Sequence, residues 1–280
     1  MSGAAPRHGL APGTAFGAAV IALYALVALA SLTPLFDAGL ALDVGARLAP
    51  PSARHWFGTD PLGRDVFAMV AVGARTSLAV AVGAVLLGML AGTPLGLAAA
   101  ARGGLTDELL ARANDLLFAF PALLLAVLLS AALGPGALTA VIAIGVFNVP
   151  VFARLVRGSA RALMTRDFVL AARIAGRGPL AIAFVHLLPN LAGLLLVQAA
   201  IQLSLGIAAE AGLSYVGLGA QPPAPSWGRM LNDAQTLVGT APWLAWFPGL
   251  ALAIAVLALG LLGDGLARLL DPRAAARRGP

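Results

Sequence analysis

Residues 77–100 read SLAVAVGAVLLGMLAGTPLGLAAA, a run without a single charged side chain. An α-helix rises about 1.5 Å per residue, so about 20 apolar residues cross the roughly 30 Å hydrocarbon core of a bilayer. Helix is the expected conformation because lipid offers no hydrogen-bond partner to the backbone, and a helix satisfies its own amide and carbonyl groups. This run therefore predicts a membrane-spanning helix.

Apolar runs of this kind recur along the chain and predict six spanning helices. The spans cover about residues 15–36, 77–100, 116–134, 137–157, 190–210 and 244–267. The third is short and holds Pro121 near its start, which predicts a kink or a longer, partly interfacial helix. The sequence thus predicts an all-α, polytopic integral membrane protein. Its single membrane domain, about residues 15–273, lies between tails at 1–14 and 274–280.

Composition agrees with a membrane protein and excludes several kinds of chemistry. Hydrophobic residues make up 60% of the chain and charged residues 11%, against about 25% charged in an ordinary soluble domain. The chain has no Cys, which excludes a disulfide, a thiolate nucleophile and a Cys-ligated metal. It also has no Lys, so it cannot form a P-loop. If transport uses ATP, another polypeptide must hydrolyse it.

The basic residues, all of them Arg, indicate membrane topology. A net charge of +6 can mark a nucleic-acid-binding protein, but here the Arg residues flank apolar runs, and no nucleic-acid partner is expected. With the N-terminus inside, thirteen Arg fall in inner segments and five in outer ones, at 47, 54, 64, 75 and 229. Because cytoplasmic loops carry the excess of basic residues, both termini are predicted in the cytoplasm.

The first apolar run has a second interpretation. Arg7, the apolar stretch and Ala28-Leu29-Ala30 also resemble a cleavable signal peptide. The stretch continues through Phe36, which is long for a signal peptide and favours a retained helix.

Two segments between spans, residues 37–76 and 211–243, are long and rich in turn-forming residues. They are predicted as outer loops made of helix breakers, which either dock an external partner or serve as plain connectors. The four Trp residues lie in or beside these loops and are predicted to anchor at the membrane interface: Trp56, Trp227, Trp243 and Trp246.

The inner loop at about 158–189 is predicted to contain one short helix. Thr165 can cap its free amides, Asp167 suits the positive end of its dipole, and Gly176 with Pro179 ends it. One face would carry small residues open to another protein. The candidate residues are Asp167, Phe168, Val169, Leu170, Ala171, Ala172, Arg173, Ala175 and Gly176, with Phe168, Ala171, Ala172 and Ala175 on the contact face. The alternative is an amphipathic helix lying on lipid headgroups.

Polar side chains inside the spans are the candidates for a translocation path. Gln198 and Gln202 are four residues apart on one helix face, and Glu210 follows near the outer end. Interhelical hydrogen bonding is the alternative role for the two Gln. Asn148 could satisfy a carbonyl freed by Pro150. Outside the spans, Glu108 and Arg112 are spaced to form an exposed helix ion pair.

Several stretches match one known family in their order and spacing. They are residues 57–67 (FGTDPLGRDVF), 107–110 (DELL), 210–219 (EAGLSYVGLG), 221–228 (QPPAPSWG), 262–266 (LGDGL), and the loop helix followed by 186–190 (HLLPN). The chain resembles the permease subunits of binding-protein-dependent ABC importers, in particular the dipeptide, oligopeptide and nickel subfamily. In one position it departs from that family, because Leu170 stands where the coupling loop usually has Glu. This puts in doubt any polar contact of that Glu to an ATPase.

The resemblance implies a type I ABC importer permease fold in the bacterial cytoplasmic (inner) membrane. It implies a homologous second permease, two ABC ATPase subunits that use ATP and magnesium, and an extracytoplasmic substrate-binding protein. The loop helix would transmit movement from the ATPases, and the cargo would be peptides or similar small solutes, with nickel import possible. The chain itself would bind no cofactor or metal and have no catalytic site.

Two other classes of function fit the sequence less well. An ion- or proton-coupled secondary transporter would need titratable groups near the midplane of the membrane, and no Asp, Glu or Arg lies deep in a predicted span. A membrane enzyme would need a catalytic motif, and neither HExxH nor GxSxG occurs.

Overall fold

The computed structural model of the protein describes residues 12–270, so nearly all of the predicted N-terminal tail and the whole C-terminal tail lie outside the described residues. Between these limits the chain is helical and contains no β-strand. In chain order the elements are α1 (Pro12–Ala30), α2 (Pro34–Gly39), the short 3₁₀ helix η1 (Val44–Ala46), α3 (Val66–Arg102), α4 (Gly104–Ala119), α5 (Ala122–Leu133), α6 (Ala137–Leu163), α7 (Asp167–Ile174), α8 (Pro179–Ala181), the π-helical segment η2 (Ile182–Leu187), α9 (Leu188–Tyr215), α10 (Trp227–Ala234) and α11 (Trp243–Leu270).

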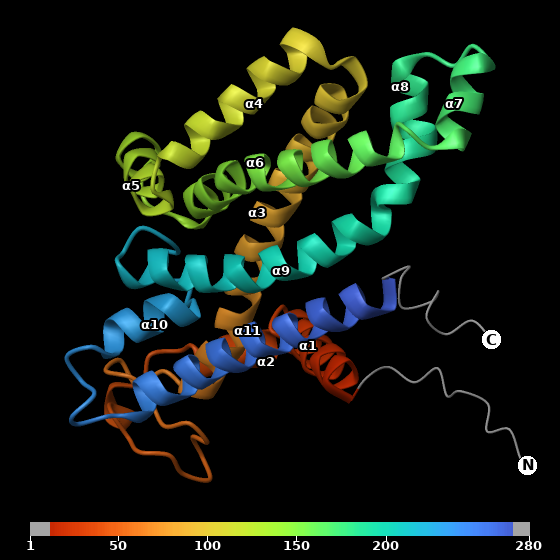
Figure 1. Ribbon diagram of the computed structural model, residues 1–280. Helices are drawn as coiled ribbons and strands as arrows, with labels where there is room; N and C mark the ends of the chain where they lie inside the picture. The colour runs from red at the N-terminus through yellow and green to blue at the C-terminus, as the bar shows by residue number, and fades with distance from the viewer. Residues whose placement is uncertain (1–11, 271–280) are drawn as a thin grey trace, which may run out of the picture.

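Figure 1 shows a bundle of long helices with small elements at its two ends. We call one the α7 end, where α7 and α8 lie, and the other the α10 end, where α10 lies beside the loop that precedes α3. Within residues 12–270, five helical segments are long and apolar enough to cross a membrane: α1, α3, α6, Pro179–Tyr215 and α11. A sixth span results if α4 and α5 count as one pair, which is bent by 87°. The count of six holds only if the bent α4–α5 pair is one span, and the predicted third span, 116–134, is divided at Pro121 between the end of α4 and α5.

The ends of several helices differ from the sequence prediction. α3 begins at Val66 instead of 77, because the Asp65 carboxylate caps it and accepts from the backbone amides of Phe67 at 2.8 Å and Ala68 at 3.3 Å. α1 starts at Pro12 and ends at Ala30, and the residues up to 36 belong partly to the separate α2. The segment predicted as the outer loop 37–76 is therefore partly helical.

The second predicted outer loop, 211–243, also contains more helix than expected. α9 continues to Tyr215, and α10 begins after Ser226, whose hydroxyl accepts from the amide of Arg229 at 3.3 Å. Trp227 is fully buried rather than placed at an interface, and its indole Nε1 donates to the carbonyl of Val70 at 3.0 Å. This side chain fastens α10 to α3. The exposed Trp residues are Trp56 and Trp246.

α3 and α6 meet almost backbone to backbone. Gly88, Gly92 and Gly96 recur every four residues on α3, along the face turned to α6. A Cβ added at these positions would lie 2.3 Å from the Cβ of Asn148, 2.4 Å from the carbonyl oxygen of Val149, and 2.5 Å from that of Ala153, respectively. Because only glycine fits such a close approach, this stripe sets the distance between the two helices.

α1 packs on α11 through another close contact. A Cβ at Gly17 would lie 2.5 Å from the carbonyl oxygen of Ala258. Near the other end of α1, the Tyr24 hydroxyl donates to the carbonyl oxygen of Ala251 at 3.0 Å. The first and last spans of the described chain are thus held side by side.

Candidate functional site

α7 is a short helix with a well-formed C-terminus. Gly176 has a φ of +77°, the left-handed conformation that glycine adopts without strain. Its amide donates to the carbonyl of Arg173 at 3.0 Å, and the amide of Arg177 donates to that of Ala172 at 3.0 Å. These two bonds form a Schellman motif, as the sequence predicted for this glycine. The predicted cap at Thr165 was wrong: its hydroxyl donates backward to the carbonyl of Ala162, and Arg166 occupies the cap position without a side-chain bond.

The faces of α7 differ from the prediction. Val169 is fully buried and Ala172 nearly so, while the other residues of the helix are exposed. Ala172 was predicted on the contact face, but at 100° per residue it lies next to Val169 on the face that packs against the bundle. The opposite, outward face is therefore centred on Asp167, Leu170, Ala171 and Ile174. Phe168, Arg173 and Ala175 lie at its flanks.

The buried face of α7 joins a core shared by three spanning segments. Val169 belongs to the same buried cluster as Leu97 of α3, Val156 of α6, Leu187 of η2 and Leu191 of α9. The connection to α6 is also short in sequence, because α6 ends at Leu163 and α7 begins at Asp167. α7 is therefore packed directly on these helices.

Two ion-pair groups connect α4 to α6. Asp107 of α4 is nearly buried and pairs with both Arg157 and Arg161 of α6, with 2.8 Å from Arg157 Nη2 to Asp107 Oδ2. Further along, Arg154 of α6 donates to Asp115 of α4 at 2.5 Å. Sequence spacing does not reveal these pairs, because the partners are 39 to 54 residues apart.

The one ion pair that sequence spacing did predict in this region is present. Arg112 Nη2 lies 2.6 Å from Glu108 Oε1, and both side chains are exposed. Pairs of this kind on a helix surface contribute only a few tenths of a kcal/mol. The ion pairs that hold α4 in place are those to α6.

A largely apolar cavity of about 440 Å³ lies between α5, α6 and α9. Gln202 and Asn148 are among the residues that line it, and the Gln202 Nε2 donates to the Asn148 Oδ1 at 2.6 Å. Asn148 was predicted to bond a backbone carbonyl freed by Pro150, but its side-chain oxygen Oδ1 accepts the hydrogen bond from Gln202 instead. The Asn148 Nδ2 is buried without a hydrogen-bond partner among the described residues. This amide pair is the polar part of the cavity wall.

The other two path candidates lie elsewhere. Gln198 is half-buried and does not line the cavity. Glu210 is fully buried, and its Oε1 accepts from the Ser214 hydroxyl at 2.6 Å. The Ser214 hydroxyl in turn accepts from the amide of Ala220 at 3.1 Å. Glu210 therefore stabilises the turn that follows α9, and its side chain does not line the cavity.

At the α10 end, the Asp60 turn (residues 58–65) satisfies its own polar groups. The Asp60 carboxylate accepts from the amides of Leu62 and Arg64, both at 2.8 Å, and from Arg64 Nε at 2.7 Å. Trp243 Nε1 donates to the carbonyl of Thr59 at 3.1 Å, which ties the turn to α11. The turn is thus a rigid polar structure rather than a flexible connector.

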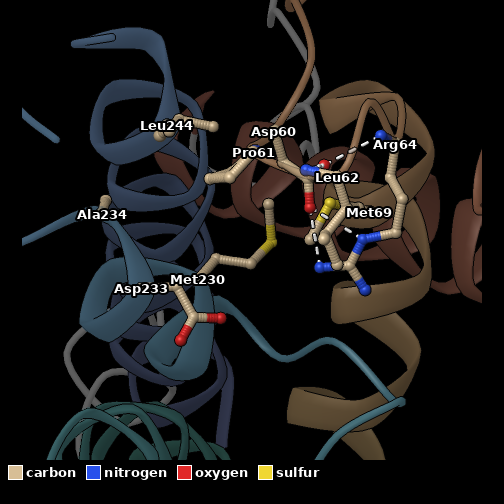
Figure 2. A pocket seen from close by; sticks show the side chains of 9 residues that line it. All are labelled: Asp60, Pro61, Leu62, Arg64, Met69, Met230, Asp233, Ala234 and Leu244. Atoms are coloured by element: carbon tan, nitrogen blue, oxygen red, sulfur yellow. Dashed lines mark hydrogen bonds and ion pairs between the residues drawn. The ribbon is translucent and has the colours of Figure 1, made fainter. Parts of the chain in front are cut away.

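A pocket of about 220 Å³ separates the Asp60 turn from α10 (Figure 2). Figure 2 shows the paired Asp60 and Arg64 on one side and Asp233 on the other, with the thioethers of Met69 and Met230 between them. Asp233 is itself paired with Arg229 at 3.0 Å, so the charges around the pocket are balanced. Among residues 12–270, no group of three or more His, Asp and Glu side chains is placed to hold a metal ion.

Comparison with known proteins identifies the family. The family model described as "binding-protein-dependent transport system inner membrane component" matches residues 92–276. The glutathione transport system permease protein GsiD of Pectobacterium atrosepticum is 42% identical over 259 residues, which cover 92% of this chain and 86% of the relative. The dipeptide transport system permease protein DppC of Alkalihalophilus pseudofirmus is 44% identical over 227 residues, or 81% and 75% of the two chains.

Solved structures agree with this assignment at the level of the fold. A chain from an inward-facing structure of the MetNI methionine ABC transporter aligns with a TM-score of 0.60 at 20% identity, covering 74% of this chain and 98% of that one. A second inward-facing MetNI structure gives a TM-score of 0.59 at 21% identity. The predicted permease fold is confirmed, and the chain belongs to the family of inner membrane components of binding-protein-dependent transport systems.

Proposed function

We propose that this chain is the permease subunit of an ATP-driven importer of short peptides, glutathione-like peptides included. The observation that carries the proposal is the similarity along most of the chain to permeases of dipeptide and glutathione transport systems. The names of these relatives indicate peptide substrates, so nickel is not proposed as the transported solute. A second, homologous permease, two ATPase subunits and an extracytoplasmic binding protein would complete the machine.

In this proposal the α7 end lies in the cytoplasm and receives the movement of the ATPase subunits. Support comes from the exposed outward face of α7 and from the buried Val169, which joins α7 to α3, α6 and α9. Closure of the ATPases would displace α7 as a rigid unit and tilt the helices that share its core. The α10 end, with its ordered Asp60 turn, would then face the binding protein, and both termini would be cytoplasmic.

The translocation path is proposed to run along the cavity between α5, α6 and α9. Its wall is apolar except for the Gln202 and Asn148 amides, which suits passage of solutes without strong binding. Among the polar residues singled out in the spans, Gln202 is the one we assign to the path. Gln198 and Glu210 would have structural roles.

Reconstitution tests the function directly. The chain would be purified with its partner subunits, placed in liposomes, and supplied with binding protein loaded with radiolabelled dipeptide or glutathione. We expect uptake that requires both ATP and the ATPase subunits. Substrate-driven uptake by the permease without ATPase subunits would instead favour the secondary transporter and contradict the proposal.

A double substitution tests the assignment of Gln202 to the path. Gln202→Leu removes the hydrogen bond that Asn148 accepts and is expected to change the uptake rate while ATP hydrolysis continues. Gln198→Leu, the same change one helical turn away, is the control and should leave uptake close to wild type. If the double variant Gln202→Leu with Asn148→Leu transports like wild type, the amide pair has no role in the path.

A further inference from the structure

A second cavity, of about 270 Å³, lies between the last turns of α3 and the segment formed by α8 and η2. We call it the α3–η2 cavity. The buried Leu97 and Ala183 form its inner wall, and Leu180 and Phe184, which are 58% and 50% exposed, line it as well. Among the described residues that line it, Arg102 has the one polar side chain. The cavity is thus an apolar space with a single cation beside it.

The α3–η2 cavity lies on the side of α3 that is turned away from α6. Gly92 and Gly96 face α6, and Pro94 and Ala98, which line the cavity, each follow two residues later, about 200° around the helix. The cavity shares no lining residue with the one between α5, α6 and α9. Leu90, one turn before Pro94, is exposed, as expected for a helix face in contact with lipid. The cavity is therefore separate from the proposed path.

The charges of α3 place the cavity at the membrane surface. Residues 76–101 contain no charged side chain, and this stretch is bounded by Arg75 and Arg102. Between the two Arg residues α3 rises about 40 Å, which is about the thickness of a bilayer with its headgroup layers. Arg102 therefore lies at the headgroup level of one leaflet. From Arg102 to Pro94 the cavity follows α3 for about 12 Å toward the hydrocarbon.

The positive charge beside the cavity has no counterpart in the described chain. Arg102 is exposed and forms no ion pair with a residue of 12–270. Arg177, two residues before the lining residue Pro179, is exposed and unpaired in the same sense. Basic sites between spanning helices at the membrane surface bind phosphate-bearing lipid headgroups. The complementary ligand has an apolar chain and an anionic phosphate.

We propose that the α3–η2 cavity binds an anionic phospholipid, with one acyl chain in the cavity and the phosphate on Arg102. The π-helical η2 (Ile182–Leu187), which forms part of the wall, agrees with this assignment, because π-helical turns are rare and occur frequently at functional sites. The lipid would fill the space between α3 and the segment that leads into α9. This inference goes beyond the proposed function and does not depend on the transported solute.

The absence of Cys from the chain permits a direct optical test. Phe184→Cys would be labelled with bimane, and the full chain placed in liposomes that contain lipids with brominated acyl chains, which quench a fluorophore on contact. Phosphatidylglycerol and phosphatidylcholine with the same chains would be compared. We expect phosphatidylglycerol to quench at about fivefold lower mole fraction, the effect of one cation on an anionic headgroup. Leu257→Cys, exposed on α11 outside the cavity, is the control and should be quenched equally by both lipids.

A charge substitution identifies the group that holds the phosphate. Arg102→Gln in the labelled Phe184→Cys chain should abolish the preference for phosphatidylglycerol. Arg166→Gln removes the same charge from an exposed residue outside the cavity and should leave the preference unchanged. Equal quenching of position 184 by the two lipids, or a preference that survives Arg102→Gln, would overturn the inference. Absence of quenching by either lipid would show that the cavity is closed to acyl chains, which would also overturn it.

Filling the cavity gives an independent measurement. Ala98→Phe would place a ring where the acyl chain is proposed to lie and would leave Arg102 in place. Mass spectrometry of the intact chain released from detergent would count the phosphatidylglycerol molecules that remain bound. We expect Ala98→Phe to lose the lipid that the wild type retains, and Leu90→Phe, exposed outside the cavity, to retain it. Retention by Ala98→Phe equal to that of the wild type would show that no acyl chain occupies the cavity.

Discussion

The two ends of the helix bundle differ in how completely they satisfy their own side chains. At the α10 end, Asp60 accepts three hydrogen bonds within its turn, and Trp227 is buried with its indole bonded. At the α7 end, Ile174 is almost fully exposed, and Arg173 has no ion pair among the described residues. The Asp60 turn and Trp227 are thus satisfied within the chain, whereas Ile174 and Arg173 on α7 leave room for a partner.

The largest effect is expected from a change that deforms the α7 end. Gly176→Pro would force φ to about −65° where the backbone has +77°, and would remove the amide that donates to Arg173. We expect membrane insertion to persist and ATP-driven uptake to fall at least about tenfold, measured in proteoliposomes of the complete transporter. Gly178→Pro is the control, because Gly178 already has a φ of −68°. Normal uptake by Gly176→Pro would show that α7 does not transmit force.

The next largest effect tests whether the α10 end is self-sufficient. Asp60→Ala removes three hydrogen bonds and leaves the mostly buried Arg64 without its partner. We expect a loss of about 3 kcal/mol in stability, since an unpaired charge remains in a confined site. Thermal unfolding in detergent would measure it. Asp43→Ala is the control, because it loses only one exposed hydrogen bond, from the amide of Gly45, and its melting temperature should be close to that of the wild type. Equal melting temperatures for the Asp60 and Asp43 variants would show that the Asp60 turn does not stabilise the α10 end.

A smaller effect is expected at the junction of α4 and α6. Asp107→Asn removes the negative charge shared by Arg157 and Arg161, which are 30% and 48% exposed. Solvent screens both guanidinium groups, so we expect a loss of about 1 to 2 kcal/mol. High salt should narrow the difference in melting temperature between variant and wild type. A difference that salt leaves unchanged would show that packing, not charge, holds α4.

The smallest effect is expected from Glu108→Gln. Its pair with Arg112 is exposed on both sides, so the loss should be about 0.3 kcal/mol. Neither melting temperature nor uptake should change measurably. A large loss would indicate that Glu108 contacts a partner subunit.

The sequence predicted features that depend on local composition. Apolar runs revealed the spans, and Gly176 with Pro179 revealed the end of α7, because lipid and backbone geometry act residue by residue. The start of α3 was missed because Arg75 interrupts the apolar run, although the cap at Asp65 was a usable signal. α10 was missed because the surrounding Pro and Gly residues suggested a loop, although Ser226 was again a possible cap.

Tertiary contacts account for the remaining errors. The contact face of α7 could not be chosen from sequence, since Val169 and Ala172 are buried only because α3, α6 and η2 surround them. The partner of Gln202 was missed for the same reason, because Asn148 lies 54 positions away. Small residues occur on buried and on exposed helix faces alike, so the position of the neighbouring helices is needed to tell which face is buried.

The glycine stripe of α3 has a mechanical consequence. Because Gly88, Gly92 and Gly96 let the two backbones touch, we expect α3 and α6 to move together as one rigid beam, which α3 extends to the cap at Asp65 and α6 to the residues before α7. A rigid pair of helices can pass a movement from one end to the other without any rearrangement of side chains along it. Tilting it at one end moves the other by simple leverage, over a length set by the helices themselves.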